Sequence, residues 1–262
     1  MNFPVDDISR ILLLFVLCSV RLAATLAIVP FFSKQFIPGA GRNCVILAMA
    51  MPLIPLLIAQ LPDYNVNWLT MSGILVKEVT IGGVLGFATG FIFYVSEGVG
   101  FVVDVQRGSS MATIFDPMAG SQTSLLGSTL LQIMSAMFFA SGGFLFLMSL
   151  IYKTYVLWPV FSFSLFPNVT FAQFFLDMFD QIMEVLLCLA APILIVLFLA
   201  EFGLGMVNRF APQLNVFFLA MPIKSWLSMA FLLMYMNIIS GFFKKYFMYD
   251  SKILEFLHIF SK

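Results

Sequence analysis

Charged side chains are scarce in this sequence. Only 10% of its 262 residues are charged, whereas 61% are hydrophobic. Soluble globular domains carry about a quarter charged residues and about half apolar residues, so a chain of this composition does not have water as its main solvent. Thirteen basic residues balance thirteen acidic ones. This balance leaves no basic field to attract a polyanion, which excludes DNA and RNA as partners.

Histidine and cysteine are also few. His258 is the one histidine, and Cys18, Cys44 and Cys188 lie far apart inside apolar runs. An odd, dispersed set of cysteines favours buried packing residues over a disulfide framework or a metal site. The sequence has no Walker A motif, and no HExxH motif or similar protease constellation. We therefore expect no enzyme activity, no catalytic residue, no bound metal and no cofactor.

Long uncharged or nearly uncharged runs fill most of the chain. A bilayer core of about 30 Å needs roughly 20 apolar residues in a helix, because lipid cannot pair free backbone groups. The runs of suitable length are residues 11–33, 43–62, 79–103, 117–152, 154–176, 185–223 and 225–243. They predict an all-α membrane protein of about six to eight apolar helices, without a basic leader that would mark a cleaved signal.

Glycines and prolines predict where these helices pack, kink or break. Gly82, Gly86 and Gly90 recur every fourth residue, so they share one helix face that another backbone can approach closely. The alternative is chance, since glycine is common in membrane helices. The run 117–152 is either one long helix or a hairpin broken at Gly142 and Gly143. Kinks are expected at the prolines inside apolar runs, at positions 52, 55, 192, 212 and 222.

Several charges lie within or beside these apolar runs. They are Arg21, Lys77, Glu78, Glu97, Asp104, Arg107, Glu201, Arg209 and Lys224. Each would cost about 2.5–3.5 kcal/mol at a helix centre facing lipid, so together they must face protein, water or one another. One interpretation is a proton or ion relay in a stand-alone ion or small-molecule transporter. The other, favoured because the charges are spread over many helices, is a set of contacts between helices or subunits of an assembly.

Two blocks of sequence are specific enough to indicate a family. The first is Asp104-Val105-Gln106-Arg107-Gly108, followed by Asp116-Pro117. The second is Glu201, then Arg209-Phe210-Ala211-Pro212-Gln213-Leu214-Asn215-Val216-Phe217, and Lys224-Ser225. With Arg21, Pro30-Phe31-Phe32 and Arg42-Asn43, they resemble the export-gate T component of bacterial type III secretion, whose flagellar relative is FliR. The D-x-Q-R-G form is more similar to the virulence (injectisome) branch than to the flagellar one.

The resemblance implies a subunit rather than a complete machine. Residues 1–262 would form a single helical domain of hairpins that assembles with R and S subunits into a cone-like gate. That gate would be the inner-membrane entry channel for unfolded secreted proteins, partly raised toward the periplasm. Further partners implied are the switch (U) component, the large export-gate (V) component, secreted substrates in transit and membrane lipid.

The segment 108–123 is expected to be a loop at membrane depth. It is rich in small and polar residues, and Pro117 disfavours helix at Asp116. Such a loop must be buried in protein or line a cavity. The resemblance implies a plug in the channel, for which the candidate residues are Gly108, Met111, Ile114, Phe115, Asp116, Pro117, Met118 and Gly120. A simple turn between helices is the alternative.

The segment 211–215 is expected to separate two helices, with Gln213 and Asn215 pairing backbone groups freed by Pro212. A plain kink without partner contacts is the alternative. The full set of predicted contacts between helices or subunits is Arg21, Glu97, Asp104, Gln106, Arg107, Glu201, Arg209, Gln213, Asn215 and Lys224. The tail 244–262, with four lysines, is basic and is expected in the cytoplasm.

Overall fold

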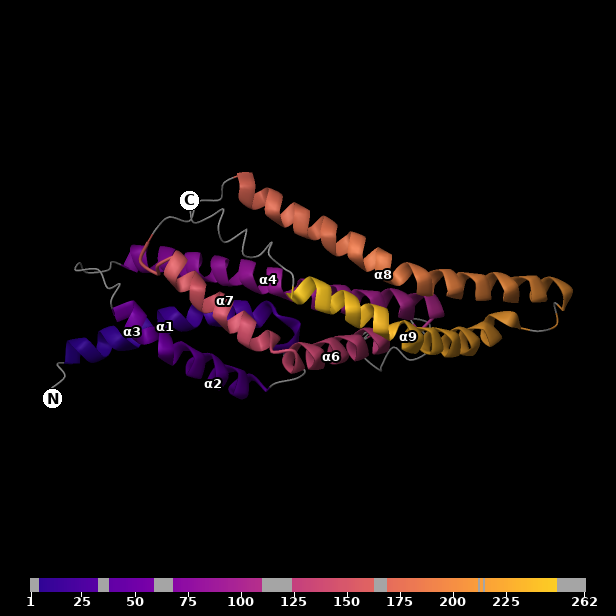
Figure 1. Cartoon of the computed structure of the whole chain (residues 1–262), viewed down its shortest axis with the longest axis horizontal. Helices are drawn as coiled ribbons and strands as arrows, with labels where there is room; N and C mark the ends of the chain where they lie inside the picture. The colour runs from indigo at the N-terminus through magenta and orange to yellow at the C-terminus, as the bar shows by residue number, and fades with distance from the viewer. Residues whose placement is uncertain are drawn as a thin grey trace. The chain divides into compact units, whose positions relative to one another are not determined.

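The structure is a computed structural model that describes residues 5–32, 38–58, 68–109, 124–162, 169–211, 213 and 215–248. All regular structure in these ranges is helical, which confirms the all-α prediction (Figure 1). The α-helices are α1 Val5–Ile28, α2 Gly39–Ala50, α3 Ile54–Ile58, α4 Trp68–Arg107, α6 Leu125–Ala140, α7 Gly143–Leu157, α8 Val169–Phe210 and α9 Val216–Met248. Two short 3-10 helices, η1 Pro30–Phe32 and η2 Met51–Leu53, precede α2 and α3 respectively.

Contacts between the helices group the chain into two compact units. Unit 1 consists of Met1–Phe91, Phe138–Phe175 and Asp250–Lys262, and unit 2 consists of Ile92–Met137 and Leu176–Tyr249. The long helices α4 and α8 each contribute residues to both units. The sequence offers no sign of this division, because the boundaries fall inside continuous apolar helices.

Four helical stretches of the described chain are long and apolar enough to cross a membrane. They are Gly39–Ile58, Thr70–Arg107, Phe175–Phe210 and Phe218–Phe243. A fifth stretch follows if α6 and α7 are counted as one bent span. Seven of the described helices have ten or more residues, in agreement with the six to eight apolar helices expected. The second and third stretches have 38 and 36 residues. At 1.5 Å per residue each is roughly 55 Å long, much longer than a bilayer core.

The run 154–176 is divided between two helices. No single helix covers it, since α7 ends at Leu157 and α8 begins at Val169. The break in the preceding run lies where the glycines predict it: Gly142 has a φ of 77°, and α6 and α7 meet there at an angle of 74°. This angle is a sharp bend rather than the reversal of a hairpin. The expected break at 211–215 is confirmed, because α8 ends at Phe210 and α9 begins at Val216.

Unit 1 is built around α1, which packs against α2 and α3. Phe31 and Phe32 of η1 are buried, and their rings contact aromatic residues on both sides of the α6–α7 bend. The Phe31 ring centroid lies 4.8 Å from that of Phe138, and the Phe32 centroid lies 6.1 Å from that of Phe144. The Pro-Phe-Phe motif is therefore a packing element at this bend.

The cysteines divide into two kinds. Cys18 is buried in unit 1, as expected of a packing residue, whereas Cys44 and Cys188 are exposed. The expectation that all three are buried is wrong for these two. Cys44 and Cys188 lie on the exposed faces of α2 and α8. An apolar run in the sequence does not show whether a residue faces the protein core or an exposed side of the helix.

Candidate functional site

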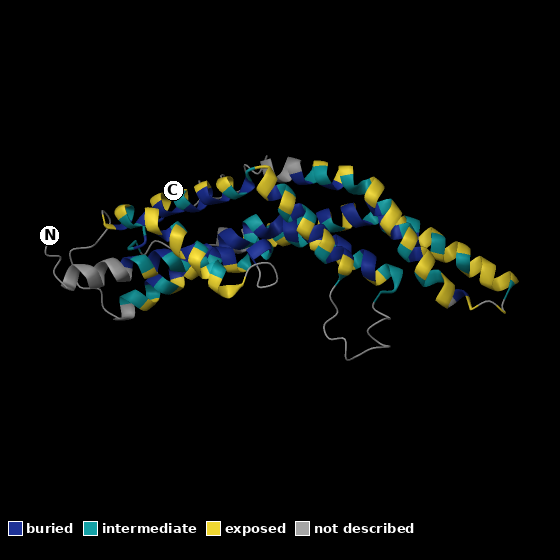
Figure 2. Ribbon diagram, turned by 90° about the horizontal axis from the view of Figure 1, so that it is seen from below, coloured by how far each residue is buried: buried dark blue, intermediate teal, exposed yellow. Residues whose placement is uncertain are grey.

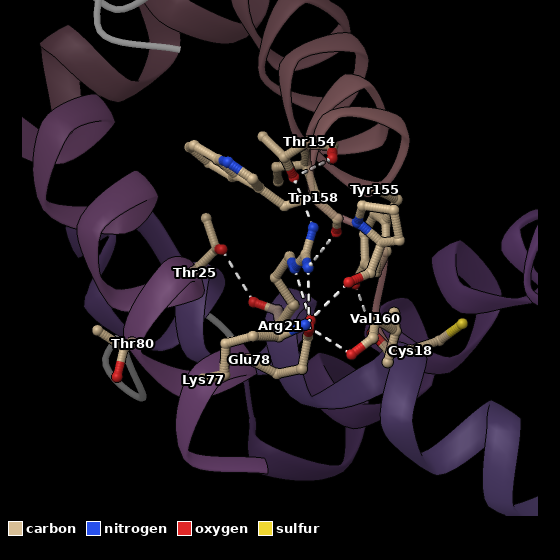
Figure 3. A network of polar contacts seen from close by, with 12 residues as sticks. Cys18, Arg21, Thr25, Lys77, Glu78, Thr80, Thr154, Tyr155, Trp158 and Val160 are labelled. Carbon is tan, nitrogen blue, oxygen red and sulfur yellow. Dashed lines mark hydrogen bonds and ion pairs between the residues drawn. The ribbon is translucent and has the colours of Figure 1, made fainter. Parts of the chain in front are cut away.

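The most deeply buried charges of the described chain meet in unit 1. Arg21 of α1 and Glu78 of α4 both have 0% of their side chains exposed. The guanidinium donates from Nε to Glu78 Oε2 at 2.6 Å and from Nη2 to Glu78 Oε1 at 2.8 Å (Figure 3). This is the two-pronged geometry in which arginine binds a carboxylate most strongly. Two of the nine charges found within or beside the apolar runs therefore neutralise each other.

The other donors of Arg21 bind the end of α7. Its Nη1 donates to Thr154 Oγ1 at 3.1 Å, and its Nη2 also donates to the carbonyl of Trp158 at 3.1 Å. The guanidinium carbon lies 4.1 Å from the centre of the Tyr155 ring, close enough for a cation–π contact. The Tyr155 hydroxyl in turn donates to the Cys18 carbonyl at 2.7 Å. Arg21 thus joins α1, α4 and α7.

Lys77 completes this cluster from α4. Its Nζ donates to the carbonyls of Pro159, Val160 and Ser162 at 2.9, 2.6 and 2.9 Å. It also lies 3.2 Å from Glu78 Oε1. The carbonyl end of a helix carries partial negative charge. The carbonyls just beyond the end of α7 therefore balance the second cation. Pro159 disfavours helix at Trp158, and the turn at 158–162 places these carbonyls around the Lys77 ammonium.

Two glycines bring α4 close enough to α1 for these contacts. A Cβ placed on Gly82 would lie 2.5 Å from the carbonyl oxygen of Arg21, and one placed on Gly86 would lie 2.6 Å from that of Thr25. No side chain fits at such distances without movement of the backbone. Gly90, the third glycine of the predicted face, is buried in the same helix.

A second polar cluster lies in unit 2, where Asp104 of α4 holds the start of α6. Its Oδ2 accepts from Ser124 Oγ at 2.6 Å and from the backbone N–H of Leu126 at 2.9 Å. Ser124 Oγ also accepts from the N–H of Gly127 at 2.7 Å, as an N-cap residue does. A carboxylate at a helix N-terminus is favoured by the helix dipole. Asp104 is 2% exposed, so this contact is largely shielded from water.

The rest of the D-x-Q-R-G block ends α4. Gly108 has a φ of 88°, the N–H of Gly108 donates to Val105 O, and the N–H of Ser109 donates to Asp104 O, both at 3.1 Å. This pattern is a Schellman motif, which requires glycine at its left-handed position. Arg107 Nη2 lies 2.7 Å from Asp104 Oδ1, an ion pair without hydrogen-bond geometry. A glycine just after a charged last turn is the sequence signal for this cap, and Gly108 is also the first of the plug candidates.

The two family blocks meet in unit 2. Lys224 Nζ lies 3.4 Å from Glu201 Oε2 and donates to the Gln106 carbonyl at 3.1 Å, while Gln106 Nε2 donates to Glu201 Oε2 at 3.4 Å. Residues from α4, α8 and α9 thus form one polar group. The side chain of Lys224 is 10% exposed, but that of Glu201 is 54% exposed. The cluster therefore opens on one side to the surface of the unit.

The other predicted contact residues do not belong to any of these clusters. Glu97, Arg209, Gln213 and Asn215 are exposed. The remaining plug candidates, Met111, Ile114, Phe115, Asp116, Pro117, Met118 and Gly120, lie outside the described residues, as does the tail beyond Met248. Within the described ranges no three His, Cys, Asp or Glu side chains are placed to hold a metal ion. The clusters are networks of ion pairs and helix caps.

Comparison with known proteins agrees with these motifs. The chain belongs to the family of bacterial export proteins, family 1, which matches residues 12–249. It is 42% identical over 233 residues to Yop proteins translocation protein T of Yersinia pestis, covering 88% of each chain. It is 33% identical over 198 residues to secretion system apparatus protein SsaT of Salmonella typhimurium, covering 73% of this chain and 74% of that one.

A flagellar relative is more distant. Flagellar biosynthetic protein FliR of Bacillus subtilis is 27% identical over 241 residues, covering 91% of this chain and 90% of its own. The resemblance stated from the motifs is thereby confirmed, and the chain is a component of a bacterial protein-export apparatus. With its apolar helices it is an integral membrane component of that apparatus, and the family is not one of known enzymes.

Proposed function

We propose that this chain is a structural and gating subunit of a type III secretion export gate. With R and S partner subunits it would form the inner-membrane entry channel for unfolded secreted proteins, next to the switch (U) and large (V) components. The family match carries this proposal, because the matched residues 12–249 include the polar clusters around Arg21, Asp104 and Glu201. The higher identity to the secretion proteins than to the flagellar one supports the injectisome branch.

An exposed arginine on α8 supports assembly with other subunits. Arg209 is exposed in a stretch apolar enough to cross a membrane, beside Met206 and Phe210, which are 44% and 82% exposed. Its guanidinium makes no hydrogen bond or ion pair with any residue that the structure describes. Arg209 lies in the last turn of α8, and wherever this end of the helix is embedded in hydrocarbon the charge would cost up to about 2.5–3.5 kcal/mol. A neighbouring subunit with a carboxylate or free carbonyls would remove this cost.

The buried cluster of unit 1 favours a structural role over solute transport. Arg21, Lys77 and Glu78 direct their polar atoms to one another and to α7. A carrier needs polar groups that can exchange their partners for a solute, whereas these are committed to the fold. We therefore assign no catalysis and no cofactor to the chain, and the energy for export would come from other components.

The lengths of α4 and α8 indicate how the subunit is placed relative to the bilayer. At roughly 55 Å, the apolar stretches of α4 and α8 are almost twice the thickness of a bilayer core. Parts of these helices must then lie outside the hydrocarbon region or tilt steeply within it. A gate partly raised toward the periplasm and enclosed by protein would meet this requirement.

Copurification tests the proposed assembly. An affinity-tagged chain is co-expressed with the R and S subunits of the same secretion system and purified in mild detergent. We expect both subunits to copurify, Arg209→Ala to reduce their yield severalfold, and Lys153→Ala, which removes an exposed cation from α7, to leave it unchanged. A chain that purifies alone as a stable monomer and transports a solute would refute the proposal.

The plug remains a separate part of the proposal. Deleting residues 110–120 would remove the proposed seal while leaving the Asp104–Ser124 contact that holds the start of α6. We expect the deletion to raise ion leakage through membranes that contain the assembled gate. Unchanged leakage with the complex still assembled would favour a simple turn between α4 and α6.

A further inference from the structure

The outer face of α9 is apolar along its whole central part. Between Ser225 and Phe243, the exposed large hydrophobic residues are Trp226, Met229, Leu233, Met234 and Ile238, from 46% to 80% exposed. They recur at helical spacing and form one stripe, whereas Ser228, Leu232, Ile239 and Phe243 on the other side are buried. Asn237 is the one polar side chain among the exposed residues of this segment. We call residues 225–243 the α9 stripe segment.

The uncharged segment between two flanking lysines is about as long as a bilayer core is thick. Lys224 precedes it and Lys244 follows it, and the 19 residues between carry no charge. At 1.5 Å per residue they extend about 28 Å, close to the roughly 30 Å of hydrocarbon in a membrane. Trp226, at one end, is 80% exposed, and tryptophan is the residue type enriched at the boundary between lipid and water.

The exposed face of α8 in the same unit lacks these properties. Phe198, Phe202 and Phe210 are similarly exposed, but Glu201 and Arg209 interrupt their face. Asp177, Asp180 and Glu184 are exposed on the preceding turns. The uncharged run between Glu184 and Glu201 has only 16 residues, about 24 Å. Both helices carry many exposed residues (Figure 2), but of the two only α9 is free of charge over the thickness of a bilayer core.

We propose that the α9 stripe segment is the face of unit 2 that contacts lipid acyl chains, and that it anchors the subunit in the bilayer. Lys224 would lie at one headgroup level, where its ammonium is held by Glu201 and the Gln106 carbonyl. The cluster made by the two family blocks would then mark the edge of the hydrocarbon region. The proposal rests on the proposed function in one respect. Its test uses the exposed face of α8 as the control, and the proposed function predicts that a partner subunit covers that face.

Site-specific photocrosslinking in native membranes tests the proposal. The photoreactive amino acid p-benzoylphenylalanine replaces Leu233 of α9 or Ile195 of α8, two apolar residues that are 66% and 58% exposed and lie inside the uncharged run of each helix. The tagged full-length chain is expressed with the other secretion genes, irradiated and purified. Intact-mass measurement detects a phospholipid adduct, and gel electrophoresis detects a protein adduct. Met234, 79% exposed, is a second position if the Leu233 variant does not accumulate.

We expect the phospholipid adduct to be severalfold more abundant at 233 than at 195. A protein adduct as the main product at 233, or equal lipid labelling at both positions, would overturn the proposal. Copurification of partner subunits from the same membranes separates the two conclusions. If position 233 labels lipid but no partner subunit copurifies, the proposed function is contradicted and the membrane anchor stands. If position 233 labels protein while the partner subunits copurify, the membrane anchor is contradicted and the proposed function stands.

Discussion

The Arg21–Glu78 cluster of unit 1 and the Lys224–Glu201 cluster of unit 2 differ in how completely they are closed. In unit 1, Arg21 and Glu78 are fully buried and bonded at 2.6–2.8 Å. In unit 2, the Lys224–Glu201 contact is 3.4 Å long and Glu201 is half exposed. A closed network in a low-dielectric interior fixes the packing of the helices that supply it, and it is costly to disturb. An open network contributes little to folding and keeps its charges at the surface, where another subunit can meet them.

The largest effect should come from the carboxylate at the centre of the closed cluster. Glu78→Ala would leave Arg21 and Lys77 as two buried cations without an anion. Removing one partner of a buried pair typically costs about 3–5 kcal/mol, so we expect little folded protein in membranes and early unfolding in a denaturing-detergent titration. Glu97→Ala, on an exposed face of the same helix, is the control. Equal stability of the two variants would mean that the cluster is not the closed network described.

A smaller loss is expected from Asp104 in unit 2. Asp104→Ala removes two hydrogen bonds to the start of α6 and leaves Arg107 without its carboxylate. Hydrogen bonds to a charged group contribute about 1.5–3 kcal/mol, and we expect a loss of that size in the same titration. Asp177→Ala, which removes an exposed carboxylate from α8, should change stability little. A neutral result for Asp104→Ala would contradict its role as the contact that holds α6.

The close approach of α4 to α1 can be tested with one methyl group. Gly82→Ala would place a Cβ 2.5 Å from the Arg21 carbonyl oxygen, and such overpacking costs about 1–3 kcal/mol. Gly203→Ala on α8 is matched in chemistry but meets nothing within 4 Å. It should be neutral or stabilise the helix by up to about 1 kcal/mol. If both variants unfolded at the same detergent concentration, the packing seam would be refuted.

The smallest effect on folding is expected for Glu201. It is half exposed and its ion pair with Lys224 is long, so Glu201→Gln should change the free energy of unfolding by less than about 1 kcal/mol. We expect the yield of copurified partner subunits to fall clearly although the free energy of unfolding changes little, because the charge lies at the open side of the cluster. A large loss of monomer stability would show that the unit 2 cluster is as closed as that of unit 1.

Composition and local patterns predicted much of the fold. The all-α class, the break at Gly142 and the break at 211–215 follow from the cost of unpaired backbone in lipid and from the backbone preferences of glycine and proline. Asp104 and Arg107 are three residues apart, a spacing that places both on one helix face, and the structure pairs them. Pro159 marks the end of α7 near Leu157 in the sequence, because a proline disfavours helix in the residue before it. Patterns did not show that the carbonyls that follow bind Lys77, more than 80 positions earlier.

The sequence by itself determined that ionised groups would be embedded in apolar helices and that they needed partners, since the energetic cost of an unpaired charge in such surroundings does not depend on the fold. Only the tertiary structure decided which partners they have. Arg21 with Glu78, and Lys224 with Glu201 and Gln106, are pairings between distant segments. Charge and hydrophobicity along a chain do not encode distance in space, and it is the crossing of helices at small residues such as Gly82 that brings these groups within 4 Å.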